Sequence, residues 1–362
     1  MNNDFNLSKY MSYGIENVVR GVVKASFNNP KETAFILKYA LSSKRAKKRR
    51  EIFERNGDKF PAFLISSITS SCNLFCKGCY SRQNKSCGED VHKQQLSPQK
   101  WEDLFKEASE LGVSFILLAG GEPLMRRDVI EKAAMVKDII FPIFTNGTML
   151  KGEYIKLLDK NRNLVPMLSI EGGKTQTDSR RGQGTYDILI DVMDNLNQKG
   201  ILYGVSVTVT TENFVTVSSI AFFDNLYRRG CRAVIFVEYV PVTKDTKQLA
   251  PTNFEREVLD LEQQKLRKEY PDAIFLSFPG DEKYAGGCLA AGRGFFHINV
   301  DGAAEPCPFS PYSDTNLNDS TLKEALKSPL FEKLNETGML LGEHDGGCLL
   351  FEKENQVKEL LD

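Results

Sequence analysis

The sequence predicts an α/β fold organised around a parallel β-sheet. Six short apolar runs alternate with helical segments between residues 59 and 246, and the connections between them are short. Strands joined through helices in this way run parallel, with right-handed crossovers. Every conspicuous polar motif follows directly after one of these runs, at the expected carboxyl end of a strand. A doubly wound sheet and a (β/α) barrel both satisfy this pattern.

Residues 1–58 predict a helical extension before the sheet. Asn29 followed by Pro30 is a typical helix start, with proline at the first helical position. Apolar residues recur at helical spacing on both sides of this start, and the helix ends in a basic run at 44–50. We interpret the run as the solvated face of a helix. The alternative is a surface for anionic lipid or an acidic partner, because apolar faces adjoin the charge.

The elements of the sheet then follow in order. Apolar-rich runs that predict strands lie at 63–68, 115–119, 139–144, 164–170, 203–210 and 233–239, and the run at 115–119 is continuous, as expected for a buried parallel strand. Pro142 costs the third strand a ladder hydrogen bond and marks its start. Helices are expected between the strands, the clearest being those that end before a glycine, at 98–111, 186–199 and 217–229.

A smaller unit is expected after the sixth strand. Thr252 and Glu255 form a capping box that opens a charged helix running to about Tyr270. Pro279-Gly280 marks a boundary, and residues 295–302 predict a strand that enters a hairpin turn. We therefore divide the chain into a helical extension at 1–58, the main α/β unit at 59–246, a bridging helix and strand at 247–280, and a C-terminal unit at 281–362.

Composition excludes several classes of protein. Of 362 residues, 41% are hydrophobic and 26% charged, which is ordinary for a globular protein. The net charge of −1 gives no indication of nucleic acid as a partner. No apolar run approaches the ~20 residues of a membrane span, and the N-terminus lacks the layout of a signal peptide. We therefore expect a cytoplasmic protein whose eight cysteines are metal ligands or free thiols rather than disulfides.

Three cysteines follow the first predicted strand. Cys72, Cys76 and Cys79 are spaced four and then three residues apart. On a tight loop this spacing lets three thiolates converge on one soft metal centre and leaves a coordination position open. The alternative is three ordinary buried or redox-inert cysteines.

This loop resembles that of the radical S-adenosylmethionine (SAM) superfamily, whose signature is CxxxCxxC after the first barrel strand. The resemblance implies that the three cysteines bind three irons of a [4Fe–4S] cluster and that SAM chelates the fourth. One electron then releases a 5′-deoxyadenosyl radical, which takes a hydrogen atom from a substrate. It also decides the fold in favour of a partial (β/α)6 TIM-type barrel. Gly78 departs from the aromatic residue usual in the family, and Tyr80 either compensates at the cofactor or simply packs.

The strand-end motifs extend the resemblance to SAM binding. Gly120-Gly121-Glu122-Pro123 follows the second strand and matches the family's motif for the SAM amino group, although a tight turn with an incidental glutamate is the alternative. Arg181 matches the arginine expected to pair with the SAM carboxylate, with Arg180 as its rival. Further expected cofactor contacts are Thr145, Asn146, Ser169 and Thr208. A plain Asn-Gly turn is the alternative for Thr145 and Asn146, and a solvent-facing strand position is the alternative for Thr208. The candidate catalytic residues are Glu171, which could contact ribose or substrate, and Glu238 on the sixth strand.

A second set of cysteines lies near the C-terminus. Cys288, a predicted hairpin, Cys307 and Cys348 resemble the shortened auxiliary-cluster domain called twitch, a relative of the SPASM domain. The resemblance implies one auxiliary [4Fe–4S] cluster. Its fourth iron is either open for substrate or held by a further residue, for which the candidates are Cys87, Cys231, His297 and His344. The alternatives are a structural zinc site and three unrelated free cysteines.

The sequence therefore predicts a radical SAM enzyme with one auxiliary cluster, served by an external one-electron donor of the flavodoxin or ferredoxin type. Its substrate is expected to be a small molecule or a lipid. The lipid option rests on the apolar and basic N-terminal segment, which suits peripheral membrane contact. The alternative within this class is modification of a ribosomally made peptide or of a protein side chain. A non-catalytic iron–sulfur electron carrier or a zinc-binding module is the alternative of another class.

Overall fold

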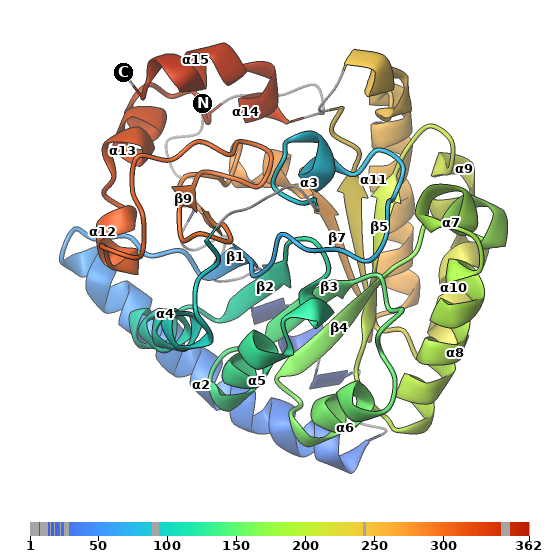
Figure 1. The fold of residues 1–362 in the computed structure, drawn as a ribbon. Helices are drawn as coiled ribbons and strands as arrows, with labels where there is room; N and C mark the ends of the chain where they lie inside the picture. The colour runs from blue at the N-terminus through green and yellow to red at the C-terminus, as the bar shows by residue number, and fades with distance from the viewer. Residues whose placement is uncertain are drawn as a thin grey trace.

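The structure is a computed structural model that describes residues 29–88, 94–241, 244–341 and 348–361, together with scattered helical residues before Asn29. Its centre is a curled nine-stranded sheet with helices around the outside (Figure 1). The strand order is β7-β6-β5-β4-β3-β2-β1-β8-β9, and all neighbours are parallel except the terminal pair β8 and β9. The six predicted strands are all present, in chain order. They are β1 (Phe63–Ser67), β2 (Phe115–Ala119), β3 (Phe141–Thr145), β4 (Leu164–Ser169), β5 (Gly204–Val209) and β6 (Ala233–Glu238).

Helices connect these strands on the outer face of the sheet. The apolar stripe of α4 includes Trp101 and Phe105, both buried against the sheet core. The predicted helix at 217–229 is broken by Ser218 and Ser219, because the hydroxyl of Ser219 caps a new helix. The connecting helices are α3 (Tyr80–Gln83), α4 (Pro98–Leu111), η1 (Pro123–Met125), α5 (Arg127–Met135), α6 (Glu153–Lys160), α7 (Lys174–Arg181), α8 (Thr185–Gln198), α9 (Phe214–Val217) and α10 (Ile220–Arg228).

Helix α2 (Pro30–Arg55) closes the amino end of the barrel. Ile36 and Tyr39 are buried in a cluster with residues of β4, and each such side chain contributes about 1.5–3 kcal/mol. The Tyr39 hydroxyl donates to the carbonyl of Ser114, just before β2, at 2.7 Å. Arg50, within the basic run, is buried and donates to the carbonyl of Gly112. The basic run is therefore only partly a solvated face, because some of its arginines dock the helix onto the barrel.

The part of the chain beyond β6 extends both edges of the sheet. After η2 (Lys244–Leu249), helix α11 (Asn253–Glu269) leads to β7 (Ile274–Phe278), which pairs with β6. After η3 (Gly280–Ala285), the predicted hairpin is β8 (His297–Ile298) and β9 (Ala304–Glu305), and β8 pairs with β1. Four short helices finish the chain, namely α12 (Leu322–Ala325), α13 (Pro329–Glu336), α14 (Leu349–Glu352) and α15 (Glu354–Glu359). Within the described residues, no helix is long and apolar enough to cross a membrane.

Candidate active site

The cysteine loop leaves the carboxyl end of β1 and runs into α3. Cys72, Cys76 and Cys79 are all half-buried along this loop. The backbone N–H of Lys77 donates to the carbonyl of Arg180 on α7 at 2.8 Å. The structure therefore holds the loop across the mouth of the barrel, against an element that is distant in the sequence.

Gly120 and Gly121 let the end of β2 touch this loop. The N–H of Gly121 donates to the carbonyl of Thr69, and the N–H of Glu122 donates to that of Ser71, both at 2.8 Å. A Cβ atom on Gly121 would lie 2.1 Å from the Ser71 oxygen, and one on Gly120 would lie 2.4 Å from the Thr69 oxygen. Only glycine permits this approach, so both glycines are required by the packing of the loop.

Glu122 is directed into the protein. Its carboxylate accepts hydrogen bonds from the Thr145 hydroxyl at 2.7 Å, the Asn146 N–H at 2.8 Å and the Leu124 N–H at 3.1 Å. Burial raises the pKa of this carboxyl group to about 7. The structure thus brings Glu122, Thr145 and Asn146 together. A carboxylate has about four acceptor positions, so three internal donors leave about one for a ligand.

Glu171 and Arg181 form a buried ion pair beside the cysteine loop. The Arg181 Nε donates to Glu171 Oε1 at 2.9 Å, and its Nη1 lies 3.9 Å from the Cys76 sulfur. The other carboxylate oxygen accepts from the Thr208 N–H at 3.0 Å, and Arg180 is 3.5 Å away. Both oxygens of Glu171 are therefore engaged within the protein, and the carboxylate orients Arg181 toward the loop.

Glu238 faces away from this mouth. Successive side chains of a strand point to opposite faces of the sheet. The next residue, Tyr239, faces Gly78 in the cysteine loop, whereas the Glu238 carboxylate pairs with Arg256 of α11 at 3.0 Å. The structure therefore brings Glu171, but not Glu238, to the cysteine loop.

The remaining predicted cofactor contacts lie at or beside the strand ends. Ser169 is half-buried at the end of β4, in register with Ser206 of β5. Pro123 begins η1 directly after Glu122. Tyr80 packs toward the C-terminal part of the chain, with its ring 4.8 Å from that of Phe309.

Tyr239 is a residue whose position the sequence patterns did not reveal. Gly78 has a φ of +67°, and a Cβ there would lie 2.7 Å from the Tyr239 hydroxyl and 3.0 Å from its Cε2 atom. The Tyr239 side chain is buried, and among the described residues its hydroxyl has no hydrogen-bond partner. The ring thus fills the space that a side chain at position 78 would need. Its place directly after the sixth predicted strand was the only signal in the sequence.

The three C-terminal cysteines also gather in space. Cys288, Cys307 and Cys348 are buried, and a side-chain hydrogen bond joins Cys307 to Cys348. Burial raises the pKa of the Cys288 and Cys307 thiols well above the ordinary value. The buried carboxylate of Glu282, which the sequence analysis did not single out, makes a side-chain hydrogen bond with Cys288.

The other residues named as fourth ligands have different partners. Cys87 makes a hydrogen bond with Cys72, which lowers the pKa of Cys72 to about 6. Cys231 donates to the carbonyl of Ala233 at 3.3 Å, at the start of β6. His297 lies between the Ser67 hydroxyl at 2.8 Å and the Glu305 carboxylate at 2.7 Å. His344 lies outside the described residues.

Both thiol sets fit iron–sulfur clusters in the chemistry of their donors. Within the ranges that the structure describes, no three His, Cys, Asp or Glu side chains are placed to hold one metal ion. The ligands of a four-iron cluster each bind a different iron, so they stand farther apart than the ligands of one ion. Three thiols with a vacant position on the first loop, and three buried thiols beside a carboxylate in the second set, fit such clusters.

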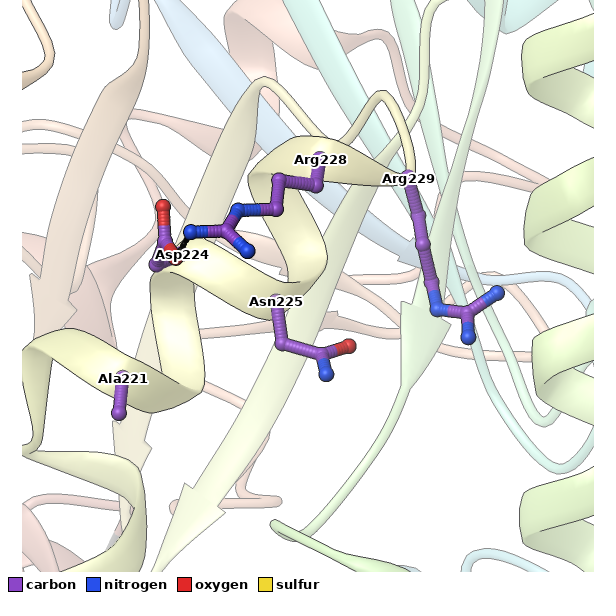
Figure 2. Close-up of a pocket in the computed structure, with 5 residues that line it drawn as sticks. All are labelled: Ala221, Asp224, Asn225, Arg228 and Arg229. Carbon is purple, nitrogen blue, oxygen red and sulfur yellow. Dashed lines mark ion pairs between the residues drawn. The ribbon is translucent and has the colours of Figure 1, made fainter.

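Two surface hollows lie elsewhere. One is formed on α10 by Ala221, Asp224, Asn225, Arg228 and Arg229 (Figure 2). Arg228 is ion-paired with Asp224 at 2.6 Å, and α10 ends toward the start of β6, opposite the cysteine loop. The other, of about 250 Å³, contains Glu238 and Arg256 between α11 and β7. Neither hollow includes a cysteine of either set.

Comparison with known proteins shows which sequences this chain resembles. The sequence profile described as "Radical SAM superfamily" matches residues 66–223. Fe-coproporphyrin III synthase of Methanosarcina barkeri is 27% identical over 244 residues, which are 66% of this chain and 59% of that protein. AdoMet-dependent heme synthase of the same organism is 24% identical over 311 residues, 78% and 87% of the two chains. Mycofactocin maturase MftC of Mycolicibacterium smegmatis is 29% identical over 167 residues, which are 45% of this chain and 41% of that protein.

Solved structures share the fold. Streptococcus suis SuiB bound to S-adenosylmethionine superposes with a TM-score of 0.68 at 17% identity, covering 84% of this chain and 77% of SuiB. The structure of anSMEcpe with bound AdoMet and Cp18Cys peptide superposes with a TM-score of 0.59 at 16% identity, covering 78% of this chain and 84% of anSMEcpe. These likenesses confirm the predicted partial barrel. The chain spans about three fifths of the length of the first relative named above.

Proposed function

This chain is a member of the radical SAM superfamily, and on that premise we propose that it cleaves SAM reductively and removes a hydrogen atom from an organic substrate. Cys72, Cys76 and Cys79 would hold the first [4Fe–4S] cluster. When bound, that cluster supplies the electron that converts SAM into methionine and a 5′-deoxyadenosyl radical. The observation that carries the proposal is the position of Arg181, which Glu171 orients so that one guanidinium nitrogen lies 3.9 Å from the Cys76 sulfur.

The neighbouring residues would bind the amino-acid part of SAM. Arg181 would donate two parallel hydrogen bonds to its carboxylate, for which a planar guanidinium is suited. The backbone at Gly120 and Gly121, which the packing holds against the cysteine loop, would meet its amino group together with the remaining acceptor position of Glu122. Ser169 and Thr208 would line the site from β4 and β5.

The second thiol set would hold an auxiliary [4Fe–4S] cluster. Cys288, Cys307 and Cys348 are buried and close to one another, and burial disfavours free thiolates there unless a metal core binds them. An external carrier of the flavodoxin or ferredoxin type would supply the electrons, and we place the protein in the cytoplasm.

We propose a small organic molecule as the substrate. The relative named for heme synthesis is matched over most of its own length, whereas the named maturase is matched over less than half. A tetrapyrrole is therefore the first substrate class to test, and a ribosomally made peptide is the second. A lipid is the third, since α2 buries one face against the barrel but exposes Leu37, Leu41 and Ile52 on its other side.

The test is SAM cleavage by the anaerobically reconstituted protein with dithionite. We expect 5′-deoxyadenosine to form, and we expect Arg181→Gln to weaken SAM binding roughly 10- to 100-fold, since a charge-assisted hydrogen bond contributes about 1.5–3 kcal/mol. Arg180→Gln is the matched control and should change SAM binding much less. Deuterium transfer from a labelled tetrapyrrole or peptide into 5′-deoxyadenosine identifies the substrate class. A fully loaded protein that forms no 5′-deoxyadenosine contradicts the proposal.

A further inference from the structure

The C-terminal thiols have a carboxylate as a close neighbour. Glu282 lies on η3, the short helix that precedes Cys288, and it is 4% exposed. Its side chain makes a hydrogen bond with the Cys288 thiol, and its Oε1 accepts the N–H of Leu289 at 3.0 Å. The backbone fixes this turn, because the N–H of Gly287 donates to the Glu282 carbonyl at 3.2 Å. The carboxylate is thus built into the loop that presents Cys288.

The electrostatics of this pocket favour a metal core. Glu282 is buried beside Cys288, whose thiol is within electrostatic range of the buried thiols of Cys307 and Cys348. A buried carboxylate is stable when it is protonated, paired with a cation or bound to a metal. Arg293 is a cation within electrostatic range of Glu282, but it donates to the carbonyl oxygens of Cys288 and Leu340. That arrangement fixes the Cys288 loop, in which the Glu282 carboxyl group contacts the Cys288 thiol.

The other candidates for a fourth ligand that the structure describes are engaged elsewhere, and His344 lies outside the described residues. Cys87 contacts Cys72 in the first thiol set, and Cys231 bonds to a backbone carbonyl at the start of β6. Both ring nitrogens of His297 have partners, Ser67 and Glu305. Among the candidates that the structure describes, Glu282 is the one in contact with the second thiol set.

We propose that Glu282 is the fourth protein ligand of the auxiliary [4Fe–4S] cluster, binding through a carboxylate oxygen the iron that the three cysteines leave. The inference rests on the auxiliary cluster of the proposed function. A carboxylate ligand gives the cluster the same net charge as a fourth cysteine would. With four protein ligands no iron is open for substrate, so the auxiliary cluster accepts an electron rather than binding the substrate.

The experiment uses the full-length chain with Cys72→Ser, Cys76→Ser and Cys79→Ser, so that the spectra report the auxiliary cluster alone. Glu282→Gln preserves shape and an oxygen for the Leu289 N–H but supplies no anionic ligand. Glu282→Cys loses that hydrogen bond and restores an anionic ligand. Asp281→Asn is the matched control, because Asp281 is one residue away and pairs with Arg267 instead.

We expect about four irons in the parent, in Asp281→Asn and in Glu282→Cys. Glu282→Gln should lose about one iron per chain on oxidation and show the EPR signal of a three-iron cluster. Before oxidation its reduction potential should be higher, because one negative charge is missing. If Glu282 only supports the loop, the opposite is expected: Glu282→Gln should match the parent in iron content and EPR signal, and Glu282→Cys should differ from it.

Two results would overturn the assignment separately. If the parent binds a cluster and Glu282→Gln matches it in iron content, EPR and potential, Glu282 is not a ligand. If the parent binds no iron, or binds zinc in its place, both the auxiliary cluster and its ligand are wrong. SAM cleavage by the unmodified protein tests the first cluster independently of either outcome.

Discussion

Replacing Gly78 with alanine perturbs the contact between the cysteine loop and β6. The backbone at Gly78 has a φ of +67°, which costs an alanine about 1–2 kcal/mol. The new methyl group would also lie 2.7 Å from the Tyr239 hydroxyl and 3.0 Å from a ring carbon, and overpacking of this kind costs about 1–3 kcal/mol. We therefore expect Gly78→Ala to destabilise the chain by roughly 2–5 kcal/mol.

A matched glycine separates the two contributions. Gly338 also has a φ of +67°, but a Cβ there would meet nothing within 4 Å. Gly338→Ala should therefore cost only the backbone part. Tyr239→Phe should restore part of the loss in Gly78→Ala, since it removes the nearest atom. By itself Tyr239→Phe should be neutral or stabilising, because the buried hydroxyl has no hydrogen-bond partner in the part of the chain that the structure describes.

The assay is anaerobic thermal unfolding of the four variants, with iron content measured on the same samples. Gly78→Ala should melt several degrees lower than Gly338→Ala and should retain less iron at the first cluster. The double variant with Tyr239→Phe should lie between Gly78→Ala and the wild type. Equal losses in Gly78→Ala and Gly338→Ala would refute the reasoning, because the ring of Tyr239 would then not limit the space at position 78.

Three further predictions concern charge and metal. Burial raises the pKa of Glu122 from 4.5 to about 7, so the folded chain holds this proton more tightly than the unfolded chain. This proton stabilises the folded state fully below about pH 4.5, and the stabilisation, up to ~3 kcal/mol, is lost as the pH rises to about 7. Between pH 4.5 and 7 the melting temperature of cluster-free wild type should therefore fall more than that of cluster-free Glu122→Gln. Arg162→Ala removes the partner of buried Glu32, 2.8 Å away, and should cost about 3–5 kcal/mol in unfolding experiments, more than the double alanine variant. Cys288→Ala with Cys307→Ala should lower the iron content from about eight to about four per chain, and unchanged iron would contradict the auxiliary cluster.

The sheet could be predicted because its strands have strong local signals. Each strand lies in an apolar-rich run, and each of the first five runs ends at a polar or glycine-rich motif. Parallel pairing then brings those motifs to one edge, which is why Glu122, Glu171 and the cysteine loop were expected together. Contacts between distant segments have weaker signals in the sequence. β8 has two residues, and nothing in its sequence shows that it pairs with β1.

Individual side-chain roles depend on contacts that the sequence does not encode locally. The sixth strand alternates between faces, and its period alone does not say which face looks into the barrel. The structure settles that Tyr239 meets the cysteine loop and Glu238 meets α11. The role of Glu282 was not predicted, because the glutamate lies in a polar segment of the sequence and belongs to no recognisable motif. Its contact with Cys288 comes from the folding of the whole C-terminal segment.

The two thiol sets belong to one packed structure rather than to a barrel and an appended module. Domain boundaries are places that few contacts cross, yet several cross here. His297 of β8 joins the Ser67 hydroxyl, at the end of the strand that leads to Cys72, to the Glu305 carboxylate, just before Cys307. The ring of Tyr80 packs at a tilt against that of Phe309, which lies just beyond Cys307.

Truncation before β8 would therefore do more than remove a cluster. It would uncover the edge of β1, the strand that delivers the first cysteine loop, and would leave Ser67 without its buried partner. Because β1 is shared in this way, the position of each thiol set depends on the other segment being folded. The two centres are thus held in a fixed relation by the sheet itself, which suits the passage of an electron between the barrel and the auxiliary site.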